Sequence, residues 1–388
     1  MIDESTPSNA RKFVAIIGCG FVADLYLRSI ELHTEVDVVG VFDIDRDRLK
    51  AFCAYWDLKS FGELEALLAE LPEDGVVLNL TSPAAHYEVT RACLEFGRHV
   101  YSEKPLATEV DQALELVDLA RSRNLLLAGA PCSYLSEAAR TLDQAIDHDL
   151  CGPVRLIYAE LDDGYIPQAP HHLWMSESGA PWPYEDEMRT GCTLEHAGYV
   201  LTWMIAIFGS IKSITAFSTT TIDKKLDPDC KTPDTSIGII HFEAGQILRL
   251  TITIVAPHNH QVLITGDKGT LSLDETWDNY AKVKYRKRFR IRRRLMESPI
   301  AKRLRLHQRQ DGARVAKRGS SKMNYFLGPN EMLRFLKYGG DNLASSDLAL
   351  HTTEATLVLQ NAGVTSTTHT MRTRCDPLPL HKYGMSGT

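Results

Sequence analysis

Short apolar runs alternate with amphipathic stretches over the first third of the chain. Residues 84–96 and 110–123 carry apolar side chains at helical spacing, and mostly apolar segments lie at 13–17, 36–42, 75–80, 99–102 and 125–128. Runs without polar alternation are typical of strands covered on both faces. Strands that alternate with helices predict a right-handed parallel sheet. We therefore expect an α/β fold, with a first domain over residues 13–130.

The pattern changes after Ala130. We expect helices over 136–147, 191–208, 328–338 and 347–362, and strands over 154–161, 213–220, 236–242, 246–254, 261–266 and 270–273. Successive strands joined by tight turns predict an open, mostly antiparallel sheet. The sequence thus predicts a second α/β domain over 131–364, with loose polar tails at 1–12 and 365–388. Residues 162–189 are rich in Gly, Pro and aromatics, and a loop of this length predicts a substrate-facing lid.

A glycine-rich turn follows the first predicted strand directly. It reads Gly18-Cys19-Gly20-Phe21-Val22-Ala23 and leads into a predicted helix. Gly18 permits a tight turn, Gly20 allows close approach to a pyrophosphate, and Ala23 allows close packing of helix on sheet. The free N–H groups at the start of a helix favour phosphate. The sequence predicts a dinucleotide-binding Rossmann domain, with backbone contacts along this turn.

Asp43 stands at the end of the second predicted strand. At this spacing an acidic residue hydrogen-bonds the adenosine ribose, and its charge disfavours a 2′-phosphate. We therefore expect NAD, with NADP as the alternative because Arg46 and Arg48 lie nearby. A second interpretation is that Asp43 only caps the next helix. Asp45 is equally placed for that task.

Residues 97–106 read G-R-H-V-Y-S-E-K-P-L. The strand over 99–102 runs into Glu103, Lys104 and Pro105, and Pro105 must end it because proline has no N–H. Open α/β sheets bind ligands at the carboxyl ends of their strands. Lys104 is therefore a candidate catalytic or ligand-binding residue.

Four segments together resemble the Gfo/Idh/MocA oxidoreductases, the family of glucose–fructose oxidoreductase and inositol dehydrogenase. They read G-C-G-F-V-A, T-S-P-A-A-H, G-R-H-V-Y-S-E-K-P-L and G-C-T-L-E-H-A-G-Y. The resemblance implies that Thr81, Ser82, Pro83 and His86 line the nicotinamide side of the cofactor cleft. It also implies that Glu103 contacts cofactor, that Lys104 reaches both cofactor and substrate, and that the Lys104–Pro105 bond is cis.

Glu195 and Tyr199 are four residues apart on a predicted helix and therefore share one face. By the resemblance, Glu195 occupies a position where an Asp is usual, and Tyr199 the position of the usual proton-transferring His. We expect Lys104 to lower the pKa of Tyr199, so that the two transfer a proton together. His196 is a reserve candidate. The alternative is a buried helix in which Tyr199 and Glu195 only hydrogen-bond each other.

Charge is unevenly distributed over the chain of 388 residues, whose net charge is −7. Residues 282–322 carry seventeen Lys or Arg and two acidic residues, a local balance of +15, which leaves −22 for the remainder. This basic segment predicts either an anion-binding surface, including peripheral contact with a membrane, or a solvated insertion that interrupts the sheet. No nucleic-acid recognition fold accompanies it.

The eight cysteines are scattered, and no apolar run is long enough to span a bilayer. Together these features predict reduced thiols and a cytoplasmic protein. His171 and His172 lack further ligands at metal-binding spacing, so we expect no metal.

The function that the sequence favours is hydride transfer between NAD(P) and a secondary alcohol or ketone of a sugar-like substrate. Tyr199 and the G-A-P-C-S turn are similar to relatives that reduce keto groups on nucleotide-linked sugars; a free polyol is the second choice. Two alternatives stay open, an NAD-dependent glycoside hydrolase and a non-catalytic dinucleotide-binding regulator. The resemblance also implies a homodimer or homotetramer formed through the second sheet.

Overall fold

The first sheet is parallel and carries helices on both faces. The computed structural model describes residues 11–222, 230, 232–305, 314–318 and 321–383. The strand order is β2-β1-β3-β4-β5 and every pairing is parallel. The strands are β1 (Lys12–Ile17), β2 (Val36–Phe42), β3 (Val76–Asn79), β4 (His99–Ser102) and β5 (Leu127–Gly129). The helices are α1 (Phe21–Ile30), α2 (Arg46–Trp56), α3 (Leu64–Glu70), the short η1 (Pro83–Ala85), α4 (His86–Glu95) and α5 (Val110–Ser122).

Side chains of β1 show why its apolar run is unbroken. Val14 and Ile16 belong to one buried cluster, whereas Ala15 and Ile17 belong to another on the opposite face. A strand with helices on both sides has no polar face, as its sequence predicted. The parallel order confirms the expected Rossmann-type sheet.

The second sheet has ten strands and is mostly antiparallel, as expected. Its order is β13-β12-β11-β10-β6-β9-β8-β7-β15, with β14 beside β12, and β6 pairs with β9 in parallel. The strands are β6 (Val154–Asp162), β7 (Ile211–Thr219), β8 (Thr235–Phe242), β9 (Ile247–Thr253), β10 (Val262–Gly266), β11 (Gly269–Leu273), β12 (Lys284–Ile291), β13 (Arg294–Glu297), β14 (Lys302–Arg303) and β15 (Thr368–Thr370).

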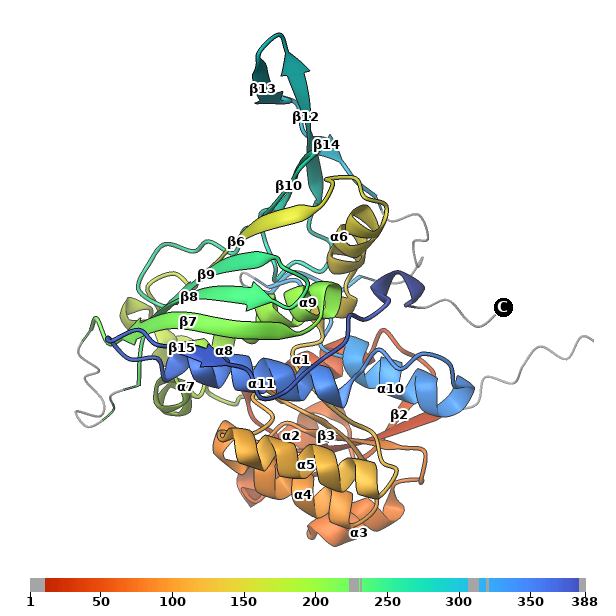
Figure 1. Ribbon diagram of the computed structural model, residues 1–388. Helices are drawn as coiled ribbons and strands as arrows, with labels where there is room; N and C mark the ends of the chain where they lie inside the picture. The colour runs from red at the N-terminus through yellow and green to blue at the C-terminus, as the bar shows by residue number, and fades with distance from the viewer. Residues whose placement is uncertain (1–10, 223–229, 231, 306–313, 319–320, 384–388) are drawn as a thin grey trace, which may run out of the picture.

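Helices fill the space between the two sheets (Figure 1). In particular, α11 contacts α5 and β5 on one side and α9, β7 and β8 on the other. The helices of this half are η2 (Ser133–Leu135), α6 (Glu137–Asp147), α7 (Tyr184–Thr190), α8 (Cys192–His196), α9 (Gly198–Phe208), α10 (Leu327–Tyr338), α11 (Ser346–Gln360) and η5 (Leu380–Lys382). Within the described residues, no helix combines the length and apolar character needed to cross a membrane.

The basic segment extends the second sheet and does not interrupt it. β12 pairs with β11 and forms a hairpin with β13 that projects from the end of the sheet remote from the parallel sheet (Figure 1). Tyr285, Phe289 and Ile291 alternate with charged residues, which is the period of a strand. The predicted insertion is therefore wrong for 284–303. Residues 306–313 and 319–320 of this segment lie outside the described residues.

The C-terminal tail is not loose up to residue 383. β15 pairs with β7, and Cys375, Leu380 and Tyr383 are buried. Isolated apolar residues in a polar stretch have no periodicity, so the sequence carried no signal for this packing. Residues 1–10 of the predicted N-terminal tail and 384–388 of the C-terminal tail lie outside the described residues.

Candidate active site

The glycine-rich turn has the shape that a pyrophosphate needs. Gly18 has φ +97°, and a Cβ there would lie 2.6 Å from the carbonyl carbon of Leu80. Gly20 is exposed, and a Cβ on it would meet nothing within 4 Å. No side chain caps the start of α1. Its first N–H groups are therefore available, beside open space, for a phosphate.

Asp43 joins the end of β2 to this turn. Its Oδ2 accepts a hydrogen bond from the Cys19 N–H at 2.7 Å, and its Oδ1 accepts one from the Asp45 N–H at 2.8 Å. Asp45 itself caps α2, where it accepts hydrogen bonds from the N–H groups of Asp47 and Arg48. Asp43 therefore does not cap α2, and its contact with a ribose remains a prediction.

Both nearby arginines are engaged within the protein. Arg48 donates to the carbonyl oxygens of Cys19 at 2.8 Å and of Ser178 at 3.0 Å. Arg46 donates to the carbonyl oxygen of Gly62.

Lys104 lies where β4 ends, in the turn that Glu103 fastens to α1. Glu103 is buried and accepts hydrogen bonds from the Tyr26 hydroxyl at 2.7 Å and the Lys104 N–H at 3.1 Å. The Lys104–Pro105 bond is cis, as the family resemblance implied. Glu103 thus holds the turn from inside the protein.

The ammonium group of Lys104 forms an ion pair with Glu195 of α8, which is itself buried. Burial acts to lower the pKa of Lys104, but Glu195, Glu187 and Glu103 together raise it above its usual value. A lysine in this setting remains a cation at neutral and moderately alkaline pH. Two of the three predicted catalytic residues, Lys104 and Glu195, are therefore brought together, although the predicted pair was Lys104 with Tyr199.

Glu187 is a site residue that the sequence did not single out. Burial raises the pKa of this carboxyl group well above its usual value, and the neighbouring Glu195 carboxylate raises it further through repulsion and a hydrogen bond. Glu187 therefore takes up a proton more readily than an ordinary glutamate. It lies on α7 in the predicted loop 162–189, where no local pattern marks it.

Tyr199 does not have the lowered pKa that the sequence predicted. Burial raises its pKa well above its usual value, and the neighbouring Tyr325, Glu103 and Glu195 add to this shift. The Lys104 charge is taken up by Glu195, so no cation stabilises a phenolate. Tyr199 packs its ring 5.4 Å from Trp277 and makes no hydrogen bond with Glu195 among the described residues. Tyr199 is therefore a neutral phenol beside the carboxyl groups of Glu103, Glu187 and Glu195.

The His86 side chain connects the turn at Pro105 to the Thr81 backbone. The ring nitrogens of His86 lie 2.7 Å from the Pro105 carbonyl oxygen and 2.9 Å from that of Thr81. Burial lowers the pKa of His86, although the two carbonyl groups and Glu103 act in the opposite direction. The His86 side chain is thus committed to positioning Pro105. Ser82 is exposed and Pro83 half-buried in the same turn, and their cofactor contacts remain predictions.

His196, the reserve candidate, is neutral. Burial, with a smaller contribution from the Lys104 ammonium, lowers its pKa to about 3. Its Nε2 lies 3.6 Å from Oδ2 of Asp163. A group that is unprotonated at neutral pH is not suited to donate a proton to substrate.

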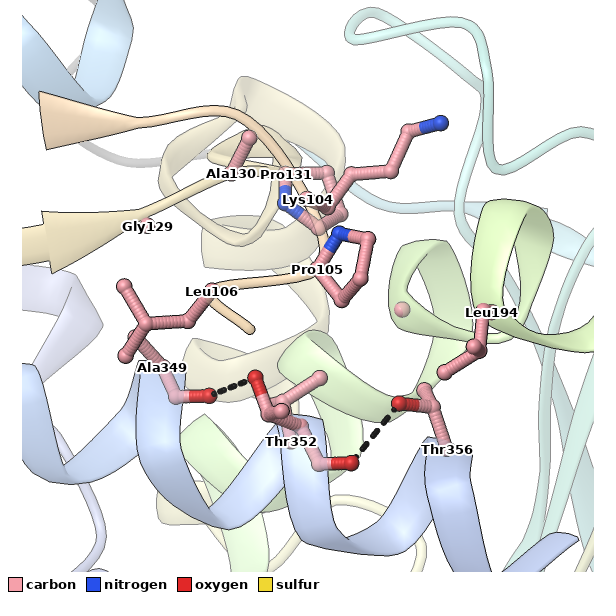
Figure 2. Close-up of a pocket in the computed structure, with 12 residues that line it drawn as sticks. Lys104, Pro105, Leu106, Gly129, Ala130, Pro131, Leu194, Ala349, Thr352 and Thr356 are labelled. Atoms are coloured by element: carbon pink, nitrogen blue, oxygen red, sulfur yellow. Dashed lines mark hydrogen bonds between the residues drawn. The ribbon is translucent and has the colours of Figure 1, made fainter. Parts of the chain in front are cut away.

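A cavity lies behind the Lys104–Pro105 bond, against α11 (Figure 2). Pro105, Ala130, Pro131 and Thr352 line it, and the ammonium group of Lys104 points away from it. The cavity lies between α11 and the loops that contain Pro105 and Pro131. It is therefore distinct from the side on which Lys104 meets Glu195.

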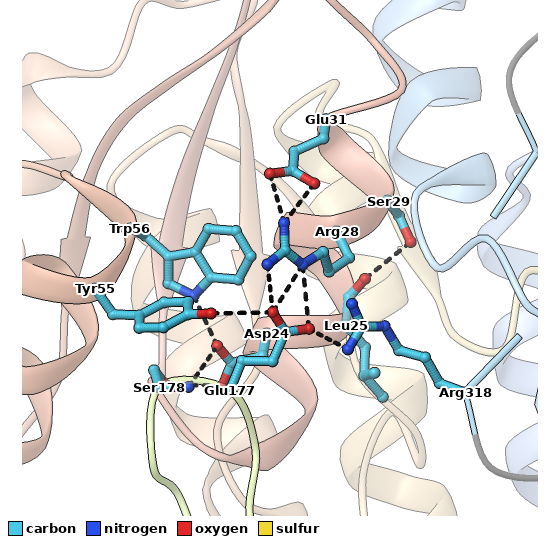
Figure 3. Close-up of polar contacts among 10 residues, drawn as sticks. All are labelled: Asp24, Leu25, Arg28, Ser29, Glu31, Tyr55, Trp56, Glu177, Ser178 and Arg318. Carbon is cyan, nitrogen blue, oxygen red and sulfur yellow. Dashed lines mark hydrogen bonds and ion pairs between the residues drawn. The ribbon is translucent and has the colours of Figure 1, made fainter. Parts of the chain in front are cut away.

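Residues 163–190 form a strap that is fastened to the parallel-sheet half of the protein (Figure 3). Glu177 at its tip accepts hydrogen bonds from Arg28 of α1 and from the Tyr55 hydroxyl, and also pairs with Arg318. Ser178 donates to the buried Asp24 of α1 from its hydroxyl at 2.8 Å. The strap includes η3 (Ile166–Gln168), η4 (His171–Leu173) and α7, so the predicted loop is partly helical.

Aromatic side chains stiffen the base of the strap. The rings of His171 and Tyr184 are stacked at 3.7 Å, and Trp174 and Trp182 meet edge to face at 5.0 Å. These contacts use the aromatics that the sequence assigned to a lid.

Comparisons with known proteins agree with this geometry. A family model described as "Oxidoreductase family, NAD-binding Rossmann fold" matches residues 12–129, and one described as "GFO/IDH/MocA C-terminal domain" matches residues 139–272. An uncharacterized oxidoreductase from Synechocystis is 25% identical over 270 residues, which cover 67% of this chain and 71% of the relative.

Two further relatives have described activities. A UDP-N-acetylglucosamine 3-dehydrogenase from Acidithiobacillus ferrooxidans is 27% identical over 130 residues, which cover 34% of this chain and 40% of that protein. The crystal structure of a 3-ketoreductase from Actinomadura kijaniata in complex with NADP has a TM-score of 0.68 at 16% identity, and covers 91% of this chain and 98% of that one. With both of its family models matched in order along the chain, this protein belongs to the Gfo/Idh/MocA family of NAD(P)-binding oxidoreductases.

Proposed function

We propose that this protein transfers hydride between NAD(H) and a secondary alcohol or ketone of a sugar-like substrate, with nucleotide-linked sugars preferred over free polyols. The observation that carries the proposal is the partly exposed Lys104 ammonium, held by the buried Glu195 where β4 ends. A relative described as a UDP-N-acetylglucosamine 3-dehydrogenase and a structural neighbour described as a 3-ketoreductase support the substrate class.

Each site residue has one task in this proposal. The bound dinucleotide supplies or accepts the hydride at its nicotinamide ring. Lys104 donates a hydrogen bond to the reacting oxygen and stabilises the negative charge that develops on it during reduction. Tyr199, a neutral phenol, supplies the proton to that oxygen and is reprotonated from solvent. Glu195 orients Lys104 and keeps it charged.

The proposal is tested by single-turnover reduction of a panel of UDP- and TDP-linked keto sugars, in which the loss of NADH fluorescence is measured. We expect Lys104→Met and Tyr199→Phe to slow hydride transfer by about 100-fold or more, while both still bind NADH. Glu185→Gln, an exposed change on α7, is the matched control. Full activity in Tyr199→Phe would remove the phenol from the mechanism, and NADH binding without turnover of any sugar would refute the oxidoreductase function.

NAD is proposed as the preferred cofactor because the Asp43 carboxylate keeps lone pairs for a ribose hydroxyl beside its two backbone hydrogen bonds, and both nearby arginines are engaged. We expect Asp43→Ala to weaken NADH binding and to narrow the difference between NADH and NADPH in a fluorescence titration. Equal affinity for both dinucleotides in the wild type would contradict this preference.

Assembly and location are proposed on separate grounds. We propose a homodimer or homotetramer, supported by the half-exposed Ile237, Ile239 and Leu263 on the second sheet, and a cytoplasmic location, supported by eight free cysteines. Contact with an anionic partner is proposed for the projecting hairpin β12–β13. Sedimentation velocity tests the first proposal, and a single monomeric species at micromolar concentration would contradict it.

A further inference from the structure

A group of histidine and carboxylate side chains lies beside the candidate active site and takes no part in the proposed reaction. It consists of Asp163 after β6, His258 and His260 between β9 and β10, and Glu275 after β11; we call it the His258 cluster. Asp162 and Asn259 exchange two backbone hydrogen bonds at 3.0 and 2.9 Å, and the Thr276 N–H donates to the His260 carbonyl oxygen at 3.2 Å. Backbone pairing therefore fixes all three segments.

Three members of this cluster are close enough to share one ion. A nitrogen from each of His258 and His260 and a carboxylate oxygen of Asp163 lie within 4.8 Å of one another. Small side-chain rotations bring such atoms to the distances at which a tetrahedral ion binds nitrogen and oxygen, about 2.0–2.2 Å.

Glu275 occupies the position that orients metal-binding histidines. Its carboxylate contacts Nε2 of His258 at 2.8 Å and Nδ1 of His260 at 3.0 Å. The opposite nitrogens are left over: Nδ1 of His258 lies 3.8 Å from Oδ1 of Asp163, and Nε2 of His260 is buried and makes no hydrogen bond of normal geometry with the described residues. A histidine that gives one nitrogen to a carboxylate and keeps the other free is the usual arrangement around a metal.

The unpartnered His260 nitrogen points to a ligand independently of the clustering. His260 is fully buried, and an unsatisfied polar atom at such a position costs about 1–3 kcal/mol. His258 is half-exposed and gives an ion a route from solvent.

We propose that the His258 cluster is a binding site for one divalent transition-metal ion of the zinc class, with Asp163, His258 and His260 as ligands. Two imidazoles and one carboxylate suit Zn²⁺ or Co²⁺ and not Mg²⁺ or Ca²⁺, which prefer oxygen. A fourth position is left for water or a substrate oxygen. The sequence predicted no metal because it considered only the adjacent His171 and His172, whereas these ligands converge from separate strands.

The site is one contact away from the residues of the proposed reaction. Nε2 of His196 lies 3.6 Å from Oδ2 of Asp163, and His196 follows Glu195 directly. The ion site nevertheless does not rest on the oxidoreductase proposal, because its ligands do not include Lys104, Glu195 or Tyr199.

The test is a titration of the EDTA-treated full chain with Zn²⁺ by calorimetry and with Co²⁺ by visible absorption. We expect one ion per chain with micromolar or tighter affinity, and Co²⁺ bands of a nitrogen and oxygen site. His260→Ala and Asp163→Asn are expected to abolish this binding, and Glu275→Gln to weaken it by about 10- to 100-fold. The double variant His171→Ala/His172→Ala is the matched control and is expected to bind normally.

Trp277 supplies a local readout, because its ring lies 4.3 Å from the ring of His260. Co²⁺ is expected to quench fluorescence in the wild type, and Trp277→Phe to lose this quenching while it still binds the ion by calorimetry. Absence of Zn²⁺ binding, equal binding by folded His260→Ala, or a thiolate-to-Co²⁺ absorption band would each overturn the assignment. NADH binding, measured in the same samples, reports separately on the proposed reaction.

Discussion

At the scale of single residues, the site is governed by the competition between burial and charge around Lys104. Burial alone would release its proton, and the surrounding carboxylates retain it. Burial and the nearby Glu195 carboxylate also raise the pKa of Glu187. Glu195 is the ion-pair partner of Lys104 and the largest influence that raises its pKa, so any change of Glu195 reaches Lys104 directly.

Removal of the Glu195 charge should make activity sensitive to alkaline pH. In Glu195→Gln, the largest influence that raises the pKa of Lys104 is lost while burial still lowers it. We expect the alkaline limb of kcat to move to lower pH by about 1–3 units, with little change on the acid side. A pH–rate profile measures this, with Glu185→Gln on α7 as control. An unshifted limb would show that Lys104 ionisation does not control the rate.

Two glycines of the same turn should respond differently to one methyl group. Gly18→Ala places a Cβ against the Leu80 backbone at positive φ and is expected to destabilise the fold by about 1–3 kcal/mol. Gly20→Ala meets no protein atom, so the protein should keep its stability but lose NADH affinity, because the methyl group fills pyrophosphate space. Urea unfolding and NADH titration separate these effects. Unchanged NADH affinity in Gly20→Ala would contradict this placement of the cofactor.

At the scale of elements, the strap connects the two halves of the chain by polar contacts that no local pattern encodes. Arg28 makes a bidentate contact with the Glu177 carboxylate. The Asp24 carboxylate accepts hydrogen bonds from Ser178 and from the Trp56 indole N–H, the latter at 2.7 Å. These groups come from three separate segments, the strap, α1 and α2. The strap therefore lies against α1, the helix whose start we propose for cofactor binding.

Loss of the Glu177 contact should loosen the strap without unfolding the protein. Arg28 and Glu177 are only partly exposed, and a charged contact of this kind contributes about 1 kcal/mol. We expect Glu177→Gln to release NADH about 3- to 10-fold faster in stopped-flow displacement. The weakened contact makes it easier for the strap to move away from α1 and let the cofactor leave. Glu185→Gln on the same strap is the control. Equal release rates would mean that the strap does not restrict the cofactor.

The success of sequence reasoning differed between elements for physical reasons. Both sheets were predictable because strand periodicity is local, and Gly18, Asp43 and Lys104 could be proposed as site residues because they directly follow strands. β12 was misjudged because its charged residues obscured the alternation of Tyr285, Phe289 and Ile291. Glu187 and the raised pKa of Tyr199 depend on burial among distant segments, which periodicity does not report.

At the scale of the whole molecule, buried histidines link folding to pH. His351 of α11 is fully buried: it accepts a hydrogen bond from the Ile211 N–H at 2.8 Å and lies 2.8 Å from the Thr373 hydroxyl. It thus joins the inter-sheet helix to β7 and the C-terminal tail. Burial lowers its pKa from 6.5 to about 4.

The protein should therefore lose stability in mild acid. Below pH 6.5 the unfolded chain takes up a proton at His351 that the folded chain refuses until about pH 4, so the folded state is penalised by about 1.4 kcal/mol per pH unit between these values. Urea unfolding at pH 7 and pH 5 measures this difference. His351→Gln is expected to flatten it, and the exposed His172→Gln is not. An equal pH dependence in His351→Gln would assign the effect to other groups.

The projecting hairpin gives the molecule an electric dipole. The basic segment 282–322 carries +15 and the rest of the chain −22, and β12 and β13 hold much of the positive charge at one end of the long sheet. Net charge is a poor guide to how such a molecule binds a charged surface, because salt screens interactions with protein charges more than about 10 Å from that surface. In low salt near neutral pH, this protein should bind a cation-exchange resin by its hairpin and an anion-exchange resin by its opposite end, although its net charge is −7.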